Sequence, residues 1–235
     1  MNPRGLKSLL AIASMTATLL TGCDSFPGRP TQADLPLRPT NVTNFATLYG
    51  ENCAGCHGAD GKSGAAIAMN NPVYLAIVDD SSMRRVIAGG IPGTAMPPFA
   101  QRAGGSLTDQ QIAILVAGIR KSWAVAPDAA AGAPPYSSST PGDSNSGARV
   151  YASNCQSCHG PDGKGGTAGC VVDPSYLALV SNQYLRTIVI AGRPDLGHPD
   201  WKNAAAGKPL TPRQVSDVVA WLASKRSASP IAQSD

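Results

Sequence analysis

The chain has 235 residues, which allows one or two domains of ordinary size. Only 14% of the residues are charged and 5% aromatic, while 25 Gly and 20 Pro make the chain rich in loops. The apolar share of 43% excludes wholesale disorder. A net charge of +4 without a long Lys/Arg cluster excludes nucleic-acid binding as the default interpretation.

Residues 1–22 have the pattern of an export signal. Arg4 and Lys7 precede an apolar run, Leu9 to Leu20, which is too short to span a membrane. The run closes on Leu-Thr-Gly-Cys23, which resembles a bacterial lipobox. That resemblance implies an exported lipoprotein on the periplasmic side, anchored through acylated Cys23. Asp24 resembles a signal for retention in the inner membrane. An ordinary signal peptide with an incidental cysteine is the alternative.

The rest of the chain is a tandem duplication. Shifting the sequence by 102 positions aligns residues 52–99 with residues 154–201 without a gap. We call residues 42–123 copy one and residues 147–227 copy two. A Pro-rich tether, residues 23–41, precedes copy one, and an Ala/Pro/Ser-rich linker, residues 124–146, separates the copies.

Each copy is predicted to be all-α. A first helix is expected at 43–52 and 146–154, and a middle helix at 81–88 and 182–191. The last helix begins at an N-cap threonine, Thr108 or Thr211, with apolar residues at helical spacing after it. No segment alternates convincingly enough to predict a strand.

Two C-x-x-C-H motifs carry the chemistry. Cys53, Cys56 and His57 form the first motif, and Cys155, Cys158 and His159 form the second. The two thiols and the imidazole share one face of a helical turn, so the thiols can add to the vinyl groups of one porphyrin while the imidazole reaches its iron. Two covalently bound haem c groups are therefore predicted. A zinc site is the competing interpretation, disfavoured because about 100 residues separate the motifs.

These motifs and their helical surroundings resemble the class I cytochrome c family, twice over. The resemblance implies that each copy is a small helical shell around a haem. It also implies that the carbonyls of Pro72 and Pro174 accept the N–H of the proximal histidines.

The same resemblance implies a distal Met-Pro ligand, which copy one has in Met96. Met83 lies on the predicted middle helix, a position that indicates a core residue. Met69 lies in a loop that is a less typical place for the distal ligand of this family. Copy two has no methionine, but His198 stands at the aligned position and keeps the following proline. We therefore expect His57 and Met96 at one iron, and His159 and His198 at the other. Cys170 is a competing ligand or a small buried hydrophobe.

A packing detail accompanies the duplication. In the family that the chain resembles, a small residue on the first helix lets it cross an aromatic residue on the last helix. Copy two fits with Gly147 and Trp221, whereas copy one has Phe45 and Gly118, with large and small exchanged. We expect Phe45 to pack near Gly118.

Two irons with filled axial positions predict a membrane-tethered electron carrier. Its redox partners would be other cytochromes, a cupredoxin, an oxidase or a quinol-oxidising complex. Met96 at one iron and His198 at the other predict unequal potentials, with electrons passing from copy two to copy one. Two alternatives stay open: a peroxidase-like or thiosulfate-oxidising dihaem enzyme that uses the second haem, and a fixed cytochrome subunit of a larger complex.

Overall fold

The computed structural model describes residues 28, 31, 34–123, 125–126, 128–204 and 206–226. The predicted signal peptide and Cys23 lie outside the described residues. Residues 1–41 and residues 42–235 form two separate units. In the first unit the described residues include one 3₁₀-helix, η2 (Pro39–Asn41). The second unit contains both copies.

The helices of the two copies follow the same order. In copy one they are α2 (Phe45–Asn52), α3 (Ala54–His57), α4 (Pro72–Ile77), α5 (Asp80–Gly89) and α6 (Asp109–Ser122). In copy two they are α7 (Ser144–Asn154), α8 (Gln156–His159), α9 (Pro174–Leu179), α10 (Asn182–Ala191) and α11 (Pro212–Ala223). Short 3₁₀-helices lie between them: η3 (Gln101–Ala103), η4 (Pro161–Gly163), η5 (Pro194–Leu196) and η6 (Trp201–Asn203).

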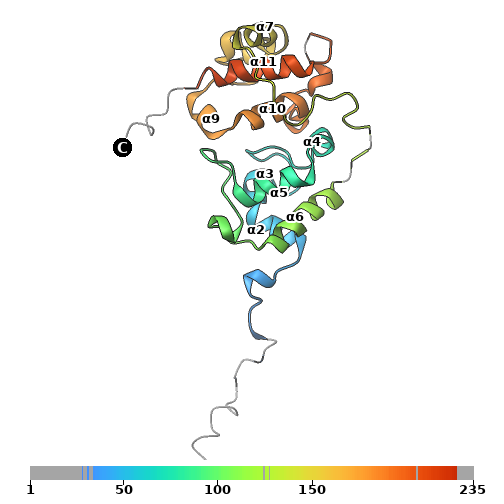
Figure 1. Ribbon diagram of the computed structural model, residues 1–235, viewed down its shortest axis with the longest axis vertical. Coiled ribbons are helices and arrows are strands. Elements are labelled where there is room, and N and C mark those ends of the chain that lie inside the picture. The colour runs from blue at the N-terminus through green and yellow to red at the C-terminus, as the bar shows by residue number, and fades with distance from the viewer. Residues whose placement is uncertain are drawn as a thin grey trace, which may run out of the picture. The chain divides into compact units, whose positions relative to one another are not determined.

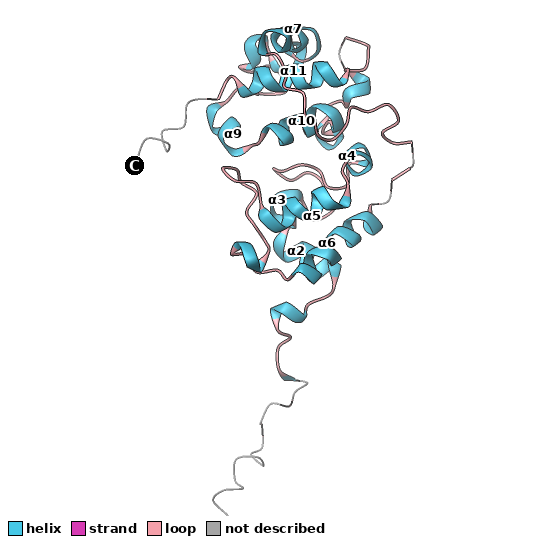
Figure 2. Ribbon diagram, viewed as in Figure 1, coloured by secondary structure: helices cyan, strands magenta, loops and turns pink. Residues whose placement is uncertain are grey.

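The described residues form no strand, which confirms the all-α prediction (Figure 2). The helices of copy one and those of copy two gather in two groups (Figure 1). Within each group the first helix contacts the last, α2 against α6 and α7 against α11. Helix α4 of copy one contacts α10 of copy two, and the buried apolar side chains of both copies form a single cluster.

Capping side chains explain where the helices begin. Thr108 and Thr211 form capping boxes with Gln111 and Gln214 at the starts of α6 and α11, as predicted. The buried apolar residues of these two helices are those that the helical spacing indicates: Ile112, Leu115, Val116, Ile119, Val215, Val218, Val219 and Leu222. Sequence analysis missed α4 and α9, each of which has an asparagine or aspartate N-cap and a proline at its first position.

The exchange of large and small residues between the copies is confirmed. A Cβ atom on Gly118 would lie 2.1 Å from the ring of Phe45, and one on Gly147 would lie 2.7 Å from the Cβ of Trp221. Copy one also has an indole that the sequence analysis missed, Trp123, which lies edge-on to the ring of Tyr49 at 5.3 Å between centroids. In copy two, Trp221 stacks on Tyr151 at 4.2 Å.

Part of the predicted linker is anchored on copy two. Arg186 of α10 donates from Nε to the carbonyl oxygens of Pro135 and Tyr136, both at 3.1 Å. A Cβ atom on Gly142 would lie 1.9 Å from the carbonyl oxygen of Ser216, so the backbone of this segment passes directly against α11. The segment before α7 is thus packed against the helices of copy two.

Candidate functional site

Each C-x-x-C-H motif occupies one turn that follows the first helix of its copy. In copy one the N–H of His57 donates to the carbonyl of Cys53 at 3.0 Å, and the equivalent bond from His159 to Cys155 has the same length. The turn therefore brings the two cysteines and the histidine to one side of the chain. No cysteine of the described part of the chain is in a disulfide, so the thiols of both motifs are available for thioether bonds.

Burial affects the first thiol of each motif. It raises the pKa of Cys53 to about 11, and the neighbouring Cys56 adds to the effect. Burial and Cys158 raise the pKa of Cys155 to about 11 in the same way. Both thiols are therefore neutral near pH 7 in the chain without haem.

The partners of the proximal histidines differ from the prediction. The Nδ1 atom of His57 lies 2.8 Å from the carbonyl oxygen of Ile67, and that of His159 lies 3.1 Å from the carbonyl oxygen of Gly169. The assignment to Pro72 and Pro174 is wrong, because these prolines begin helices α4 and α9. The acceptors nevertheless stand at aligned positions, 102 residues apart. A carbonyl acceptor at Nδ1 leaves Nε2 of each ring to bind a metal.

A tyrosine hydroxyl is hydrogen-bonded to the end of each motif turn. Neither tyrosine was predicted from the sequence to have this role. The hydroxyl of Tyr49 donates to the carbonyl of Gly58 at 2.9 Å, and that of Tyr151 donates to the carbonyl of Gly160 at 2.7 Å. Gly58 and Gly160 directly follow the proximal histidines. The 102-residue repeat of these tyrosines is the signal that could have found them.

His198 lies opposite His159 in copy two. The centroids of the two imidazole rings are 5.9 Å apart, and the Nδ1 atom of His198 is buried without a hydrogen-bond partner among the described residues. An imidazole nitrogen binds a metal ion at about 2 Å, so two imidazoles on opposite sides of one iron have centroids about 6 Å apart. The spacing and the donor set fit one haem iron between the two rings.

Burial keeps the distal imidazole neutral. It lowers the pKa of His198, and the charge of His159 lowers it further, although a backbone hydrogen bond at Pro199 works against this shift. Burial also lowers the pKa of His57, although the hydrogen bond to Ile67 works against this shift; Arg193 adds to the lowering. Neutral imidazole is the form that binds a metal ion.

The three methionine candidates of copy one occupy different environments. Met69 and Met83 are buried and belong to the hydrophobic cluster, which fits the core role expected of Met83. Met96 is only half-buried and lies outside that cluster. Its backbone is held by bonds from the N–H of Ile91 to its carbonyl at 2.9 Å and from its own N–H to the hydroxyl of Thr94 at 3.2 Å. The N–H of Ala95 also donates to the carbonyl of Leu179 in copy two at 3.2 Å, so the loop that carries Met96 is held by bonds within the loop and by one bond to the other copy.

Cys170 is exposed, so the expectation of a small buried hydrophobe does not hold. It directly follows Gly169, whose carbonyl accepts from His159. Within the described ranges, no three His, Cys, Asp or Glu side chains gather closely enough to hold a metal ion between them.

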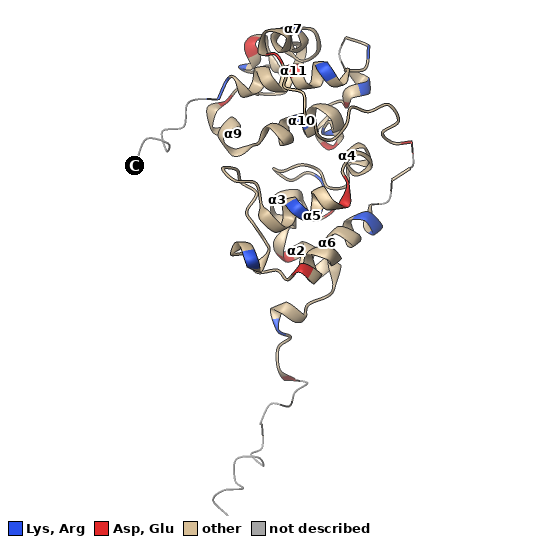
Figure 3. Ribbon diagram, in the orientation of Figure 1, with Lys and Arg blue, Asp and Glu red and all other residues tan. Residues whose placement is uncertain are grey.

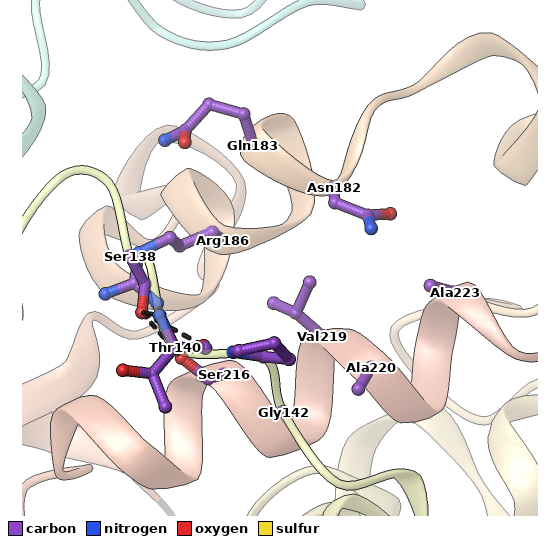
Figure 4. A pocket seen from close by; sticks show the side chains of 11 residues that line it. Ser138, Thr140, Gly142, Asn182, Gln183, Arg186, Ser216, Val219, Ala220 and Ala223 are labelled. Atoms are coloured by element: carbon purple, nitrogen blue, oxygen red, sulfur yellow. Dashed lines mark hydrogen bonds between the residues drawn. The ribbon is translucent and has the colours of Figure 1, made fainter.

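A pocket away from the motifs lies between the linker and copy two. Its volume is about 390 Å³, and its lining includes Ser138, Thr140, Arg186 and Ser216 (Figure 4). The guanidinium of Arg186 donates to the hydroxyl of Ser216 at 3.2 Å and to the carbonyl of Pro135 at 2.8 Å. These contacts anchor the linker.

The charged residues are scattered. Lys, Arg, Asp and Glu are interspersed along the helices of both copies (Figure 3). Among the described residues, every helix is too short or too polar to span a lipid bilayer.

Comparison with known proteins identifies the same duplication. Residues 40–117 and 142–222 both match the family model described as cytochrome C oxidase, cbb3-type, subunit III. The chain is 29% identical over 142 residues to a protein of Rhizobium leguminosarum bv. viciae named cbb3-type cytochrome c oxidase subunit FixPc, and 30% identical over 142 residues to subunit FixP of Sinorhizobium medicae. Each match covers 57% of the chain and 44% of the relative, so the chain matches less than half the length of these relatives.

A solved structure also resembles the chain loosely. It belongs to the Kuenenia stuttgartiensis reducing HAO-like protein complex and is 16% identical, with a TM-score of 0.46. The match covers 82% of this chain and all of the other. At this score the likeness adds nothing to the account of fold or function.

Proposed function

Because the chain belongs to the family of cbb3-type cytochrome c oxidase subunit III and carries two covalently bound haem c groups, we propose that it is an electron carrier with two low-spin sites. Each haem supplies an iron that takes up and releases one electron. Two cysteines of each copy would attach the haem, and two further side chains of that copy would hold its iron. A substrate then has no free position on either iron.

The ligand assignment follows the two motifs. Cys53 and Cys56 attach the haem of copy one, with His57 and Met96 as axial ligands. In copy two, the attachment residues are Cys155 and Cys158, and His159 and His198 are the axial ligands. The carbonyls of Ile67 and Gly169 accept at Nδ1 of the proximal rings, so Nε2 of each ring would be the atom that holds the iron.

One observation carries the proposal. His198 lies opposite His159 at 5.9 Å, with a buried ring nitrogen that has no protein partner in the described residues. A second imidazole in this position favours a closed site, which exchanges electrons but does not turn over a substrate. Thioether ligation raises the potential of a haem relative to imidazole ligation, so electrons pass from copy two to copy one.

The setting of the carrier follows from the N-terminal pattern and from the relatives. We propose that residues 1–22 direct export and that acylated Cys23 anchors the chain on the periplasmic side of the inner membrane, with residues 23–41 as the tether. Copy one and copy two then form the two haem domains, joined by residues 124–146. The two relatives are named as subunits of a cbb3-type oxidase, which favours an oxidase complex as the redox partner.

A turnover assay separates a carrier from an enzyme. In one assay the holoprotein is mixed with hydrogen peroxide and an excess of ascorbate, which supplies electrons. In a second assay it is mixed with thiosulfate and an excess of ferricyanide, which accepts electrons. A carrier reacts with neither at a catalytic rate. Sustained turnover of either compound, together with a high-spin signal from the second haem, would establish the dihaem enzyme instead.

The anchor and the partner have their own test. Membranes are extracted with mild detergent, and the haem-stained chain is followed through size-exclusion chromatography. We expect the wild-type chain in the membrane fraction and the Cys23→Ser variant in the soluble fraction. Elution together with oxidase subunits supports the oxidase partner, whereas elution of the wild-type chain alone argues for a free shuttle.

A further inference from the structure

A buried ion pair lies beside the distal loop of copy two. Arg193 and Asp195 form a bidentate pair, with Nε to Oδ1 at 2.9 Å and a terminal nitrogen to Oδ2 at 2.8 Å. Both side chains are only 7% exposed. Removing two charges from water costs free energy unless their remaining hydrogen-bonding groups also find partners. The other contacts of this pair are therefore informative.

Those contacts reach into copy one. Arg193 donates from its two terminal nitrogens to the carbonyl oxygens of Ala66 and Gly64, each at 2.9 Å. The N–H of Ser63 donates to Oδ2 of Asp195 at 2.8 Å. Ser63 has a φ of +61°, a left-handed conformation that is uncommon for serine. The pair thus holds the segment that leads to Ile67, which accepts from the proximal His57.

The backbone of Arg193 is bonded to the distal ligand of copy two. Its N–H donates to the carbonyl of His198 at 3.0 Å, and the N–H of His198 donates to the carbonyl of Arg193 at 2.9 Å. A continuous set of bonds therefore joins the acceptor of one proximal histidine to the loop of the other site's distal histidine. Arg193 is the residue common to both ends.

Copy one provides an internal comparison. Its distal loop has the same length, and the N–H of Ile91 donates to the carbonyl of Met96 at 2.9 Å, as Arg193 does to His198. The positions aligned with Arg193 and Asp195 are Ile91 and Gly93, which carry no charge. A distal loop of this fold therefore forms without the ion pair, so the pair serves the contact between the copies.

A second buried contact joins the same parts. The side-chain amide of Asn71 donates to the carbonyl oxygen of Ala191 at 2.9 Å, while its oxygen caps α4 by accepting from the N–H of Tyr74. Ala191 ends α10, two residues before Arg193. The contact between the copies is thus built from polar groups with their partners in place.

We propose that Arg193 and Asp195 form a clamp between the two haem sites. The clamp holds the distal loop of copy two in the position that places His198 opposite His159, and it fixes that loop to the segment beside the first proximal histidine. Arg193 is a positioning residue in this account. Its effect on His198 rests on the proposed ligation, whereas its effect on the contact between the copies does not.

The test compares two double variants of the full-length holoprotein. Arg193→Ile with Asp195→Gly gives copy two the residues of copy one at the aligned positions and leaves no unpaired charge. The control, Arg102→Gln with Asp109→Asn, removes an ion pair whose side chains are 61% and 77% exposed. Arg193→Lys is a further variant, which keeps a charge beside Asp195 but cannot reach both carbonyls of copy one.

Two measurements report on the two effects of the clamp. Carbon monoxide binds the reduced second haem only when His198 leaves, so we expect its binding rate to rise roughly 10–100-fold in the clamp variant and less in Arg193→Lys. Scanning calorimetry should show one unfolding transition for the wild type and the control, and two for the clamp variant. If the clamp variant does not fold, Arg193→Lys alone decides both points.

Each effect can be overturned separately. A wild-type rate of carbon monoxide binding in the clamp variant or in Arg193→Lys would show that His198 is held without Arg193. A single unfolding transition in the clamp variant, or in Arg193→Lys if the clamp variant does not fold, would show that the copies are joined by other contacts. If the wild type itself lacks a bis-imidazole spectrum, the proposed ligation fails, and calorimetry alone then decides the clamp.

Discussion

The imidazole rings of His159 and His198 are tilted by 45° and lie 5.9 Å apart between centroids. They come from different parts of copy two: His159 ends α8, whereas His198 follows η5. The ring of His159 is held by its contact with the carbonyl of Gly169, and the backbone of His198 is paired with the backbone of Arg193. Their separation leaves room for one iron between them, and on the proposed ligation the second site differs from the first.

The first prediction concerns this difference. His198→Met gives copy two the ligand type of copy one, so the midpoint potential of the second haem should rise by on the order of 100 mV. A spectroscopic redox titration of the holoprotein measures both potentials. Met96→His is the matched variant and should lower the potential of the first haem. Equal potentials in the wild type, or no change in either variant, would contradict the assignment.

The second prediction separates the methionines of copy one. Met96→Leu should remove the sulfur ligand and make the first haem accessible to carbon monoxide, because leucine cannot bind iron. Met69→Leu replaces a buried core residue of similar volume and should leave the spectrum of the oxidised haem unchanged. Loss of the sulfur signature in Met69→Leu, with Met96→Leu unaffected, would exchange their roles.

The third prediction uses two helical glycines. A Cβ atom at Gly118 would lie 2.1 Å from the ring of Phe45, whereas one at Gly50 would contact nothing within 4 Å. Gly118→Ala should therefore destabilise the protein, and Gly118→Trp should cost about 1–3 kcal/mol. Gly50→Ala should stabilise it by about 0.5–1 kcal/mol through helix propensity. Unfolding in guanidinium measures the free energy of unfolding of all three variants. An unchanged free energy of unfolding in Gly118→Ala would exclude close packing of Phe45 on Gly118.

The fourth prediction concerns the contact between the copies. Asn71→Ser keeps a side chain that can cap α4 but removes the bond to the carbonyl of Ala191, so we expect a loss of about 1–3 kcal/mol in the free energy of unfolding. Asp173, at the aligned position, caps α9 by accepting from the N–H groups of Ser175 and Tyr176. Asp173→Ser should therefore cost clearly less. Equal losses in the two variants would mean that the Asn71 contact contributes little.

The fifth prediction is a dependence on pH. The hydrogen bonds from Arg193, against some desolvation, lower the pKa of Asp195 from its ordinary value to about 2. A lowered pKa in the folded state stabilises the protein above the pKa of the unfolded chain, and this contribution is lost as the pH falls towards 2. The difference in unfolding free energy between the wild type and Asp195→Asn should therefore be smaller at about pH 3 than at about pH 5. A difference that stays constant would show that the carboxylate charge is not involved.

The sequence repeat predicts much of this molecule. A constant offset of 102 residues indicates two similar copies, and the aligned motifs identify the haem attachment and the position of His198. The volume exchange between Phe45 and Gly118 was also predictable, because a helix crossing conserves its total side-chain volume. Helix boundaries agreed within a few residues, since N-caps such as Thr108 and Thr211 mark them.

The contacts of the loops were harder to predict. Ile67 and Gly169 accept through their backbone carbonyls, and any residue type has such a carbonyl, so the sequence does not indicate them. Pro72 and Pro174, which were predicted instead, begin helices α4 and α9. The clamp of Arg193 and Asp195 joins loops more than 120 residues apart in the chain, and no local pattern predicts such a contact. An arginine without a counterpart in copy one was the available indication.

Near-infrared magnetic circular dichroism of the oxidised holoprotein tests the central claim most directly, because it reports the axial ligand pair of each low-spin haem. We expect two signals, one from a histidine–methionine pair and one from a bis-histidine pair. His198→Met should convert the second signal into the first type. A high-spin component or a thiolate signal at the second haem in the wild-type protein would contradict the account.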